Sequence, residues 1–181
     1  MHEVKLPDGI ITLSPLRLDD AAAHLAGEDE PLVRWLSGGP GTREGVDINI
    51  RHCREQWEMA GPLRAIGIRV GVDEALAGTI DLRFAAEGLA PGQVNVAYGL
   101  YPSWRGAAWP PARSSWYAAS EGGKEAVIRV EPENAASAAV AQRAGFIPGK
   151  HTHGEDGTRL DWYIRDLGID TQRRPRSPKS A

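Results

Sequence analysis

The middle of the chain contains three short apolar segments that are separated by turn-forming residues. The segments cover residues 65–70, 78–84 and 94–100, with turn clusters at 71–74 and 87–92. In the second segment apolar and polar side chains alternate, which is the pattern of a strand with one buried face. Connections of this length favour antiparallel neighbours, so the segments predict an antiparallel meander.

Segments with other periodicities surround this meander. Cys53 lies on a stripe of apolar residues at helical spacing and is expected to be a small buried residue. The helices expected from spacing or cap residues cover 21–25, 31–36, 45–59 and 135–144. Asp19 and Asp20 together are the expected cap of the first of these helices. The further strands cover 9–13, 126–130 and 159–167. This order predicts an α/β (α+β) fold with a mixed, mostly antiparallel twisted sheet of about six to seven strands and helices on both faces.

Length and charge limit how the chain is organised. Its 181 residues fit a single domain over 1–167, followed by a basic, disordered tail over 168–181. The last eleven residues carry four Arg and Lys and no acid, so the formal net charge of −3 leaves −7 on the remainder. An acidic body does not attract nucleic acid, and it mildly favours amine-bearing partners. The other interpretation is a charge that only confers solubility.

Several classes of protein are not expected. No apolar run approaches the ~20 residues that span a bilayer, and no signal peptide is visible at the N-terminus. The single cysteine, Cys53, cannot form an internal disulfide, so a cytoplasmic location is the default expectation. His151 and His153 have a spacing that suits a metal ion, but apart from Glu155 and Asp156 no further ligand is close, and turn-edge histidines are commoner. No metal site is therefore expected.

Two stretches carry candidate chemistry. Residues 98–106 run from a strand into a Gly turn, with a helix expected soon after. Backbone N–H groups at such a junction, with the helix dipole behind them, form an anion cradle suited to a pyrophosphate. In the second stretch Asn134 is the expected N-cap of a helix that Gly145 ends. Ser137 follows Asn134 by three residues, so both are expected near one face at the start of this helix.

At these residues the chain resembles the GNAT family of N-acetyltransferases, and within it the ribosomal-protein-alanine acetyltransferase (RimJ/RimL-like) branch. The resemblance covers roughly residues 9–167 and is strongest over 98–106 and 129–146. It implies a sheet whose fourth and fifth strands, here 94–100 and 126–130, splay apart to admit acetyl-CoA as co-substrate. The branch often forms dimers, and the sequence itself leaves monomer or homodimer open.

The resemblance also implies the site residues. The cofactor-binding candidates, which lie at the strand end, in the following loop and at the helix N-terminus, are Tyr98, Leu100, Tyr101, Arg105, Gly106, Ala107, Ala108, Trp109, Asn134 and Ser137. Ser137 is the candidate general acid to the leaving thiolate, and Asn134 is expected to approach the pantetheine arm and the thioester. The implied reaction is direct acetyl transfer to a primary amine, either a protein N-terminus or a small molecule.

A different residue stands at the position where this branch often has its general base. The branch often has a Glu on strand four, two residues before the Ala/Gly-Tyr pair, and Asn95 occupies that position here. Asn does not accept a proton usefully, so a base acts through water or from elsewhere. Asp81 is one candidate, and the competing interpretation makes it a solvent-facing strand residue.

The phosphate-binding motif departs from the family pattern of Arg/Gln-x-x-Gly-x-Gly/Ala. Ala108 replaces the Gly, Pro110 replaces the last small residue, and Pro111 follows. Proline has no N–H to offer a phosphate. The Cβ of Ala108 also lies where the backbone must approach the phosphate closely. A helix is still expected from Pro111 to about residue 121.

Two hypotheses address this departure. A local shift of reading frame permits Gly-Leu-Ala-Thr-Arg-Ala-Val-Leu-Leu across residues 107–116, which restores the family motif, and the coding DNA tests this origin. Alternatively, the chain is a degenerate GNAT-fold protein with weak or no coenzyme A binding, which is inactive or serves as an interaction module.

Overall fold

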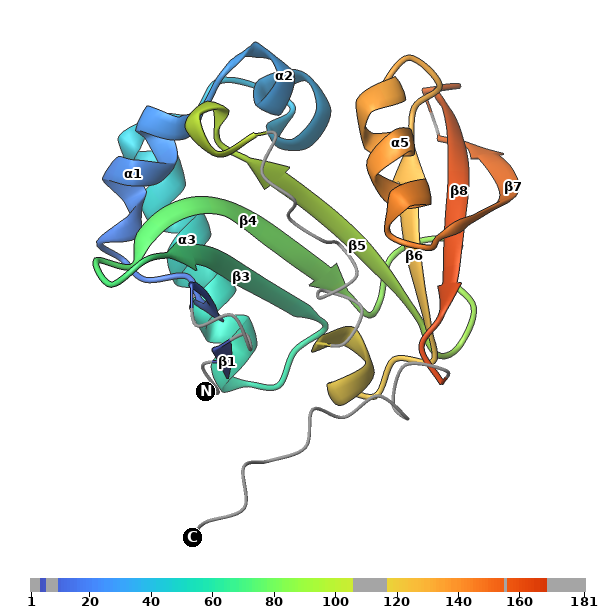
Figure 1. Ribbon diagram of the computed structural model, residues 1–181, viewed down its shortest axis with the longest axis horizontal. Helices are drawn as coiled ribbons and strands as arrows, with labels where there is room; N and C mark the ends of the chain where they lie inside the picture. The colour runs from blue at the N-terminus through green and yellow to red at the C-terminus, as the bar shows by residue number, and fades with distance from the viewer. Residues whose placement is uncertain (1–3, 6–9, 106–116, 155, 169–181) are drawn as a thin grey trace, which may run out of the picture.

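The computed structural model describes residues 4–5, 10–105, 117–154 and 156–168. Its sheet has eight strands in the order β1-β2-β3-β4-β5-β6-β8-β7 (Figure 1). The strands are β1 (Val4–Lys5), β2 (Ile11–Pro15), β3 (Leu63–Val70), β4 (Ala75–Arg83), β5 (Gln93–Leu100), β6 (Glu125–Val130), β7 (Ile147–His153) and β8 (Arg159–Asp166). All neighbours are antiparallel except β5 and β6, which are parallel. The predicted fold class is confirmed, and the short β1 and the unpredicted β7 raise the strand number.

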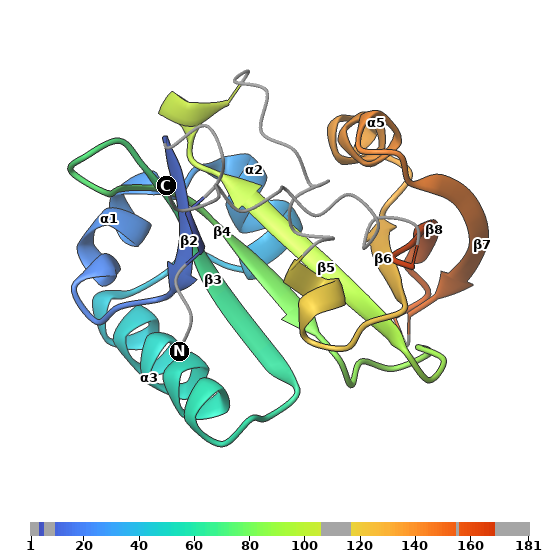
Figure 2. The ribbon, with the colours of Figure 1, turned by 60° about the horizontal axis from the view of Figure 1, so that its bottom comes forward.

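Helices cover both faces of this sheet, as expected. They are α1 (Asp20–Gly27), α2 (Glu30–Leu32), the π-helical turn η1 (Val33–Ser37), α3 (Arg43–Glu58), the 3₁₀ turn η2 (Pro102–Trp104) and α5 (Ala135–Arg143), and residues 117–120 are also helical. Figure 2 shows α1 and α3 on one side of the molecule and α5 on another. The cap of α5 is as predicted, and the chain leaves this helix through Gly145 with a positive φ of 81°.

The alternation along β4 divides the interior into two cores. Ile80 and Leu82 are buried in the larger core, together with Ala141 of α5. Between them, Asp81 turns to the face that α1 and α3 cover. There the smaller core includes Cys53, whose expected burial is confirmed. Burial raises the pKa of the Cys53 thiol to about 11, so this cysteine is a packing residue.

Strands β5 and β6 separate along their length. They pair at only three positions, Gln93 with Glu125, Val94 with Ala126 and Asn95 with Val127. Beyond these pairs β5 continues to Leu100 and β6 continues to Val130. Figure 1 shows the two strands diverging toward α2 and α5. The predicted splay of the two strands is confirmed.

A buried ion pair fastens α1 to the sheet. The guanidinium of Arg69 on β3 contacts both carboxylate oxygens of Asp20 at 2.8 and 2.7 Å, and its Nε donates to Ser14 Oγ at 2.8 Å. Asp20 Oδ2 also accepts from the backbone N–H of Arg17. The expectation that Asp19 and Asp20 together cap α1 is therefore wrong. Asp19 makes no side-chain cap bond, and the carboxylate of Asp20 pairs with Arg69, which is distant in sequence.

Several predictions fall outside the part of the chain that the structure describes. These are the phosphate-loop candidates Gly106, Ala107, Ala108 and Trp109, the start of the helix at Pro111, and the tail beyond residue 168. The boundary of the domain at residue 167 also stays a prediction. Within the described ranges, no helix has the length and apolar character that crossing a bilayer requires.

Candidate active site

Two hydroxyl groups meet across the opening between β5 and α5. Tyr98 lies on the part of β5 that has left β6, and its hydroxyl oxygen is 3.2 Å from Ser137 Oγ. The same phenol donates to the backbone carbonyl of Ser137 at 3.3 Å. Burial raises the pKa of Tyr98, although the bond to Ser137 works against this. The phenol is therefore a neutral hydrogen-bond donor at neutral pH. We call Tyr98 and Ser137 the hydroxyl pair.

Asn134 holds the serine of this pair in place. Its Oδ1 accepts a hydrogen bond from the backbone N–H of Ser137 at 3.1 Å, which is the N-cap bond of α5. The structure thus brings Tyr98, Asn134 and Ser137 together, as the prediction requires. In the structure Asn134 contacts this region through the backbone of Ser137. Its expected approach to the pantetheine arm and the thioester stays a prediction.

Replacing Asn134 by Ala is expected to lower the free energy of unfolding by about 1 kcal/mol, because α5 loses its N-cap bond. Asn134→Asp keeps a side-chain acceptor and is expected to retain most of that stability. Urea denaturation of the two variants beside wild type measures the difference. Equal stability of Asn134→Ala and wild type contradicts the structural role given to this cap.

The other described cofactor-binding candidates have partners away from the hydroxyl pair. Tyr101 is buried in the smaller core, and its hydroxyl lies 2.7 Å from His24 Nδ1. Arg105 forms two bonds with the carboxylate of Asp29, at 2.6 and 2.8 Å. Its Nε donates to the carbonyl of Leu100 at 3.0 Å. These contacts tie the end of β5 to the N-cap of α2. The predicted cofactor contacts of Leu100, Tyr101 and Arg105 stay predictions.

A glycine on β5 allows the helical segments above it to pack closely. A Cβ at Gly99 would overlap the side chain of Leu32 and approach that of Leu36. Leu32 ends α2 and Leu36 lies in η1, so the absent side chain brings both elements against β5. This packing sets one wall beside the free end of β5.

The opposite face of the sheet carries the candidate base. Asp81 is half-buried rather than solvent-facing, with 27% of its side chain exposed, and Arg83 donates to it at 2.9 Å. Burial raises the pKa of Asp81, against the opposing effects of Arg83 and His24. The nearby Asn95 is buried at 5% exposure, and its Oδ1 accepts from Arg129 Nε at 2.9 Å.

Sequence reasoning missed Arg129 and His24 as members of this region. Arg129 was expected only as part of a strand, and His24 only as a residue of a helix. The alternation along β6 could have predicted the orientation of Arg129. Its neighbours Ala126, Ile128 and Val130 are buried in the larger core. Arg129 must therefore face the side on which Asn95 lies. No comparable pattern pairs His24 with Tyr101.

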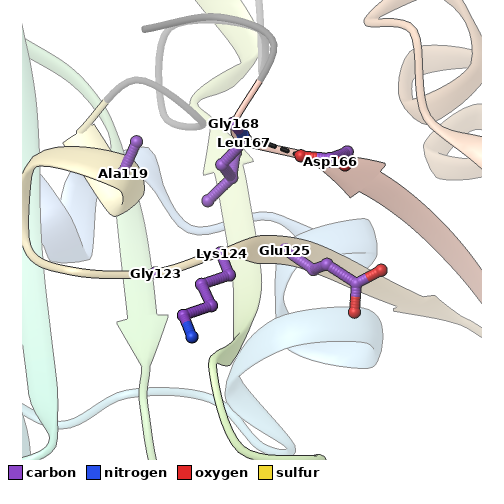
Figure 3. A pocket seen from close by; sticks show the side chains of 7 residues that line it. All are labelled: Ala119, Gly123, Lys124, Glu125, Asp166, Leu167 and Gly168. Atoms are coloured by element: carbon purple, nitrogen blue, oxygen red, sulfur yellow. Dashed lines mark hydrogen bonds between the residues drawn. The ribbon is translucent and has the colours of Figure 1, made fainter.

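A separate hollow of about 400 Å³ lies at the closed end of the sheet, where β5 and β6 are still paired (Figure 3). Its lining residues are Ala119, Gly123, Lys124, Glu125, Asp166, Leu167 and Gly168. The Glu125 carboxylate already accepts from Gln93 Nε2 at 3.1 Å. The hollow is remote from the hydroxyl pair. Across the described residues, no three His, Cys, Asp or Glu side chains gather as metal ligands.

An open sheet of this topology, parted between its two parallel strands, has the fold of GNAT acetyltransferases. The sequence agrees with the fold, since the family model described as an acetyltransferase (GNAT) domain matches residues 11–147. The chain belongs to the GNAT acetyltransferase family. No curated protein sequence matches it.

Solved structures of several acetyltransferases are similar to this chain. One is from Salmonella typhimurium and modifies the N-terminal serine of a 50S ribosomal subunit protein; it is 18% identical, with 87% of this chain and 95% of the other covered and a TM-score of 0.70. Another is the spermidine N-acetyltransferase of Vibrio cholerae in complex with CoA and spermine, at 12% identity, 87% and 96% coverage and a TM-score of 0.70. A third is the microcin self-immunity acetyltransferase MccE in complex with acetyl-CoA and AMP, at 16% identity, 87% and 92% coverage and a TM-score of 0.70. These likenesses concern the fold.

Proposed function

We propose that the protein transfers an acetyl group from acetyl-CoA directly to a primary amine, on a protein N-terminus or a small molecule. The observation that carries this proposal is the hydroxyl pair, Tyr98 and Ser137, beside the parted ends of β5 and β6. Similar solved structures include one with CoA and spermine and one with acetyl-CoA and AMP.

The described residues fit a thioester between the strands. Beyond Asn95, β5 has no strand partner on the β6 side within the described ranges, which leaves backbone groups there for the amides of a pantetheine arm. Tyr98 and Ser137 place two neutral hydroxyls beside this free edge. The pyrophosphate end of the ligand concerns residues 106–109, which lie outside the described residues.

In the proposed reaction the amine nitrogen forms a bond to the acetyl carbon, and the carbon–sulfur bond breaks. Acetyl-CoA supplies the acetyl group in activated thioester form. One proton leaves the amine and one reaches the departing sulfur. The hydroxyl pair supplies the second proton and Asp81, through water, accepts the first. The raised pKa of Asp81 brings its basicity closer to that of a useful general base. Holding both reactants in one gap supplies much of the remaining acceleration.

Acetyl-CoA binding tests this proposal against the degenerate GNAT-fold alternative. Titration calorimetry of wild type beside the triple variant Ala108→Gly, Pro110→Ala, Pro111→Thr is expected to show binding by both. The variant is expected to bind about tenfold more tightly, because each restored N–H adds a charge-assisted hydrogen bond to a phosphate.

The possible results separate the hypotheses. No heat from wild type at millimolar acetyl-CoA supports the degenerate alternative and contradicts the transferase proposal. Binding of equal affinity by both proteins contradicts the role given to backbone N–H groups at residues 108–111. Val72→Ala is the control variant and should bind acetyl-CoA as wild type does, since Val72 is 98% exposed.

A further inference from the structure

Polar residues of three strands gather where β5 and β6 part, on the face opposite Tyr98. On β4, Asp81 is directly beside Ala97 of β5. On β6, Arg129 lies two residues beyond Val127, the last residue paired with β5. Side chains two residues apart share a face of a strand, so Asp81 and Arg129 flank Ala97 from either side. Ala97 contributes only a methyl group between them.

Arg129 is held firmly by neutral groups. Its Nε donates to Asn95 Oδ1 at 2.9 Å, and its Nη1 donates to the carbonyl of Glu87 at 3.2 Å. Its Cζ lies 5.7 Å from the ring centroid of Trp162. Burial lowers the pKa of Arg129, and nearby Arg83 lowers it further, whereas the Glu87 carboxylate raises it. Within the described ranges, Arg129 makes no ion pair and its Nη2 has no hydrogen-bond partner.

A second cation lies over the same indole. Lys150 Nζ is 4.1 Å from the ring centroid of Trp162, and among the described residues no carboxylate pairs with it. Arg83, by contrast, is paired with Asp81 at 2.9 Å. Arg129 thus presents an oriented, half-buried guanidinium. Among the described residues, no carboxylate forms an ion pair with it. Such a group is suited to bind an anion, and it disfavours a purely cationic ligand.

We propose that Asp81, Ala97 and Arg129 form the acceptor subsite, and that the acceptor is an amine that carries a carboxylate or phosphate group. The anion binds Arg129, and the amine lies over Ala97 toward Asp81. This inference rests on the proposed acetyl transfer and names the class of its acceptor.

The strand spacing agrees with such an acceptor. Adjacent strands are about 4.8 Å apart, so β4 and β6 are separated by roughly 10 Å at the last shared pair and by more beyond it. Asp81 and Arg129 can therefore contact two groups on one small molecule, or the amine and the side chain of one terminal residue. A polyamine would place a cation beside Arg129, which is unfavourable.

Matched acceptor pairs test the proposal in the intact protein with acetyl-CoA. Peptides beginning with Asp are compared with peptides beginning with Asn, and phosphoethanolamine with ethanolamine, while spermidine serves as a purely cationic acceptor. The acidic member of at least one pair is expected to have a kcat/KM at least tenfold higher than its neutral partner, since hydrogen bonds to charged groups are the stronger ones. The pair that responds distinguishes a carboxylate from a phosphate.

The variant Arg129→Gln should abolish this preference by raising KM for the acidic acceptor, with little change for the neutral one. Arg129→Lys should restore part of it. Arg159→Gln is the matched control, because Arg159 is exposed and pairs with Asp161. A purely structural role for Arg129 predicts equal loss for both members of each pair, and that result overturns the inference.

The remaining outcomes are also decisive. Equal acetylation of acidic and neutral acceptors by wild type, or a preference for spermidine, overturns the acceptor inference and leaves acetyl transfer in place. Absence of transfer to every acceptor, with acetyl-CoA binding intact, overturns the proposed transfer and the inference with it. Thermal unfolding of each variant verifies that the protein remains folded.

Discussion

Replacing both members of the hydroxyl pair, Tyr98→Phe with Ser137→Ala, is expected to lower kcat for acetyl transfer by about 10²-fold. The departing sulfur then loses both neutral donors, and general acid catalysis contributes at least this much in enzymes. Each single variant is expected to lose less, because the two oxygens lie 3.2 Å apart and the remaining hydroxyl can donate. Steady-state kinetics at saturating acetyl-CoA measures the change.

Matched variants elsewhere separate this chemistry from packing. Tyr163→Phe and Ser120→Ala remove the same hydroxyl groups at other positions. Tyr163 lies on β8, and Ser120 lies in the helical residues 117–120. Both are expected to keep kcat within about twofold of wild type, since neither hydroxyl is hydrogen-bonded to Tyr98 or Ser137. A double variant of the hydroxyl pair that binds acetyl-CoA, stays folded and keeps normal kcat contradicts the assignment of Tyr98 and Ser137 as proton donors.

The largest expected effect on stability comes from Asp20→Ala. The substitution leaves the guanidinium of Arg69 buried at 3% exposure without its carboxylate partner. Breaking a buried pair from one side destabilises by about 3–5 kcal/mol, because the remaining charge is uncompensated. Urea denaturation followed by circular dichroism measures the loss, and a protein that does not fold at 25 °C is consistent with the same cause.

Asp47→Ala provides the control for this prediction. Asp47 pairs with Arg43 one helical turn away at 3.1 Å, and Arg43 has 60% of its side chain exposed. An exposed pair of this kind contributes about 0.5 kcal/mol or less. If Asp20→Ala and Asp47→Ala change stability equally, the buried ion pair does not fasten α1 to the sheet.

Local patterns were sufficient for most elements of the fold. Short apolar segments bounded by turn residues predicted β3, β4 and β5, with clear alternation in β4, and the Asn134 cap with Gly145 bounded α5. β7 was missed because its residues are almost all exposed, so its sequence has no apolar alternation, and Pro148 and Gly149 weaken any strand propensity. Its pairing with β8, rather than its own residues, makes it a strand.

The contacts that the sequence did not predict join residues that are far apart along the chain. Asp20 was expected to cap its own helix, yet its main partner, Arg69, is 49 residues away. Within the site, Asn134 and Ser137 were predicted together because they are neighbours on one helix. The contact of Ser137 with Tyr98 joins residues 39 apart, and the bond of Asn95 to Arg129 joins residues 34 apart. The register of β5 and β6 brings Asn95 to Arg129, and the position of α5 beside β5 brings Ser137 to Tyr98.

The three backbone pairs shared by β5 and β6 also decide where the sheet is open. Beyond them β5 stays paired with β4 as far as Leu100, and β6 stays paired with β8 as far as Val130 (Figure 1). Each strand that borders the gap is thus braced by a neighbour on its outer side. The gap therefore belongs to the strand pairing itself, and no backbone pairing between β5 and β6 has to break for the gap to exist.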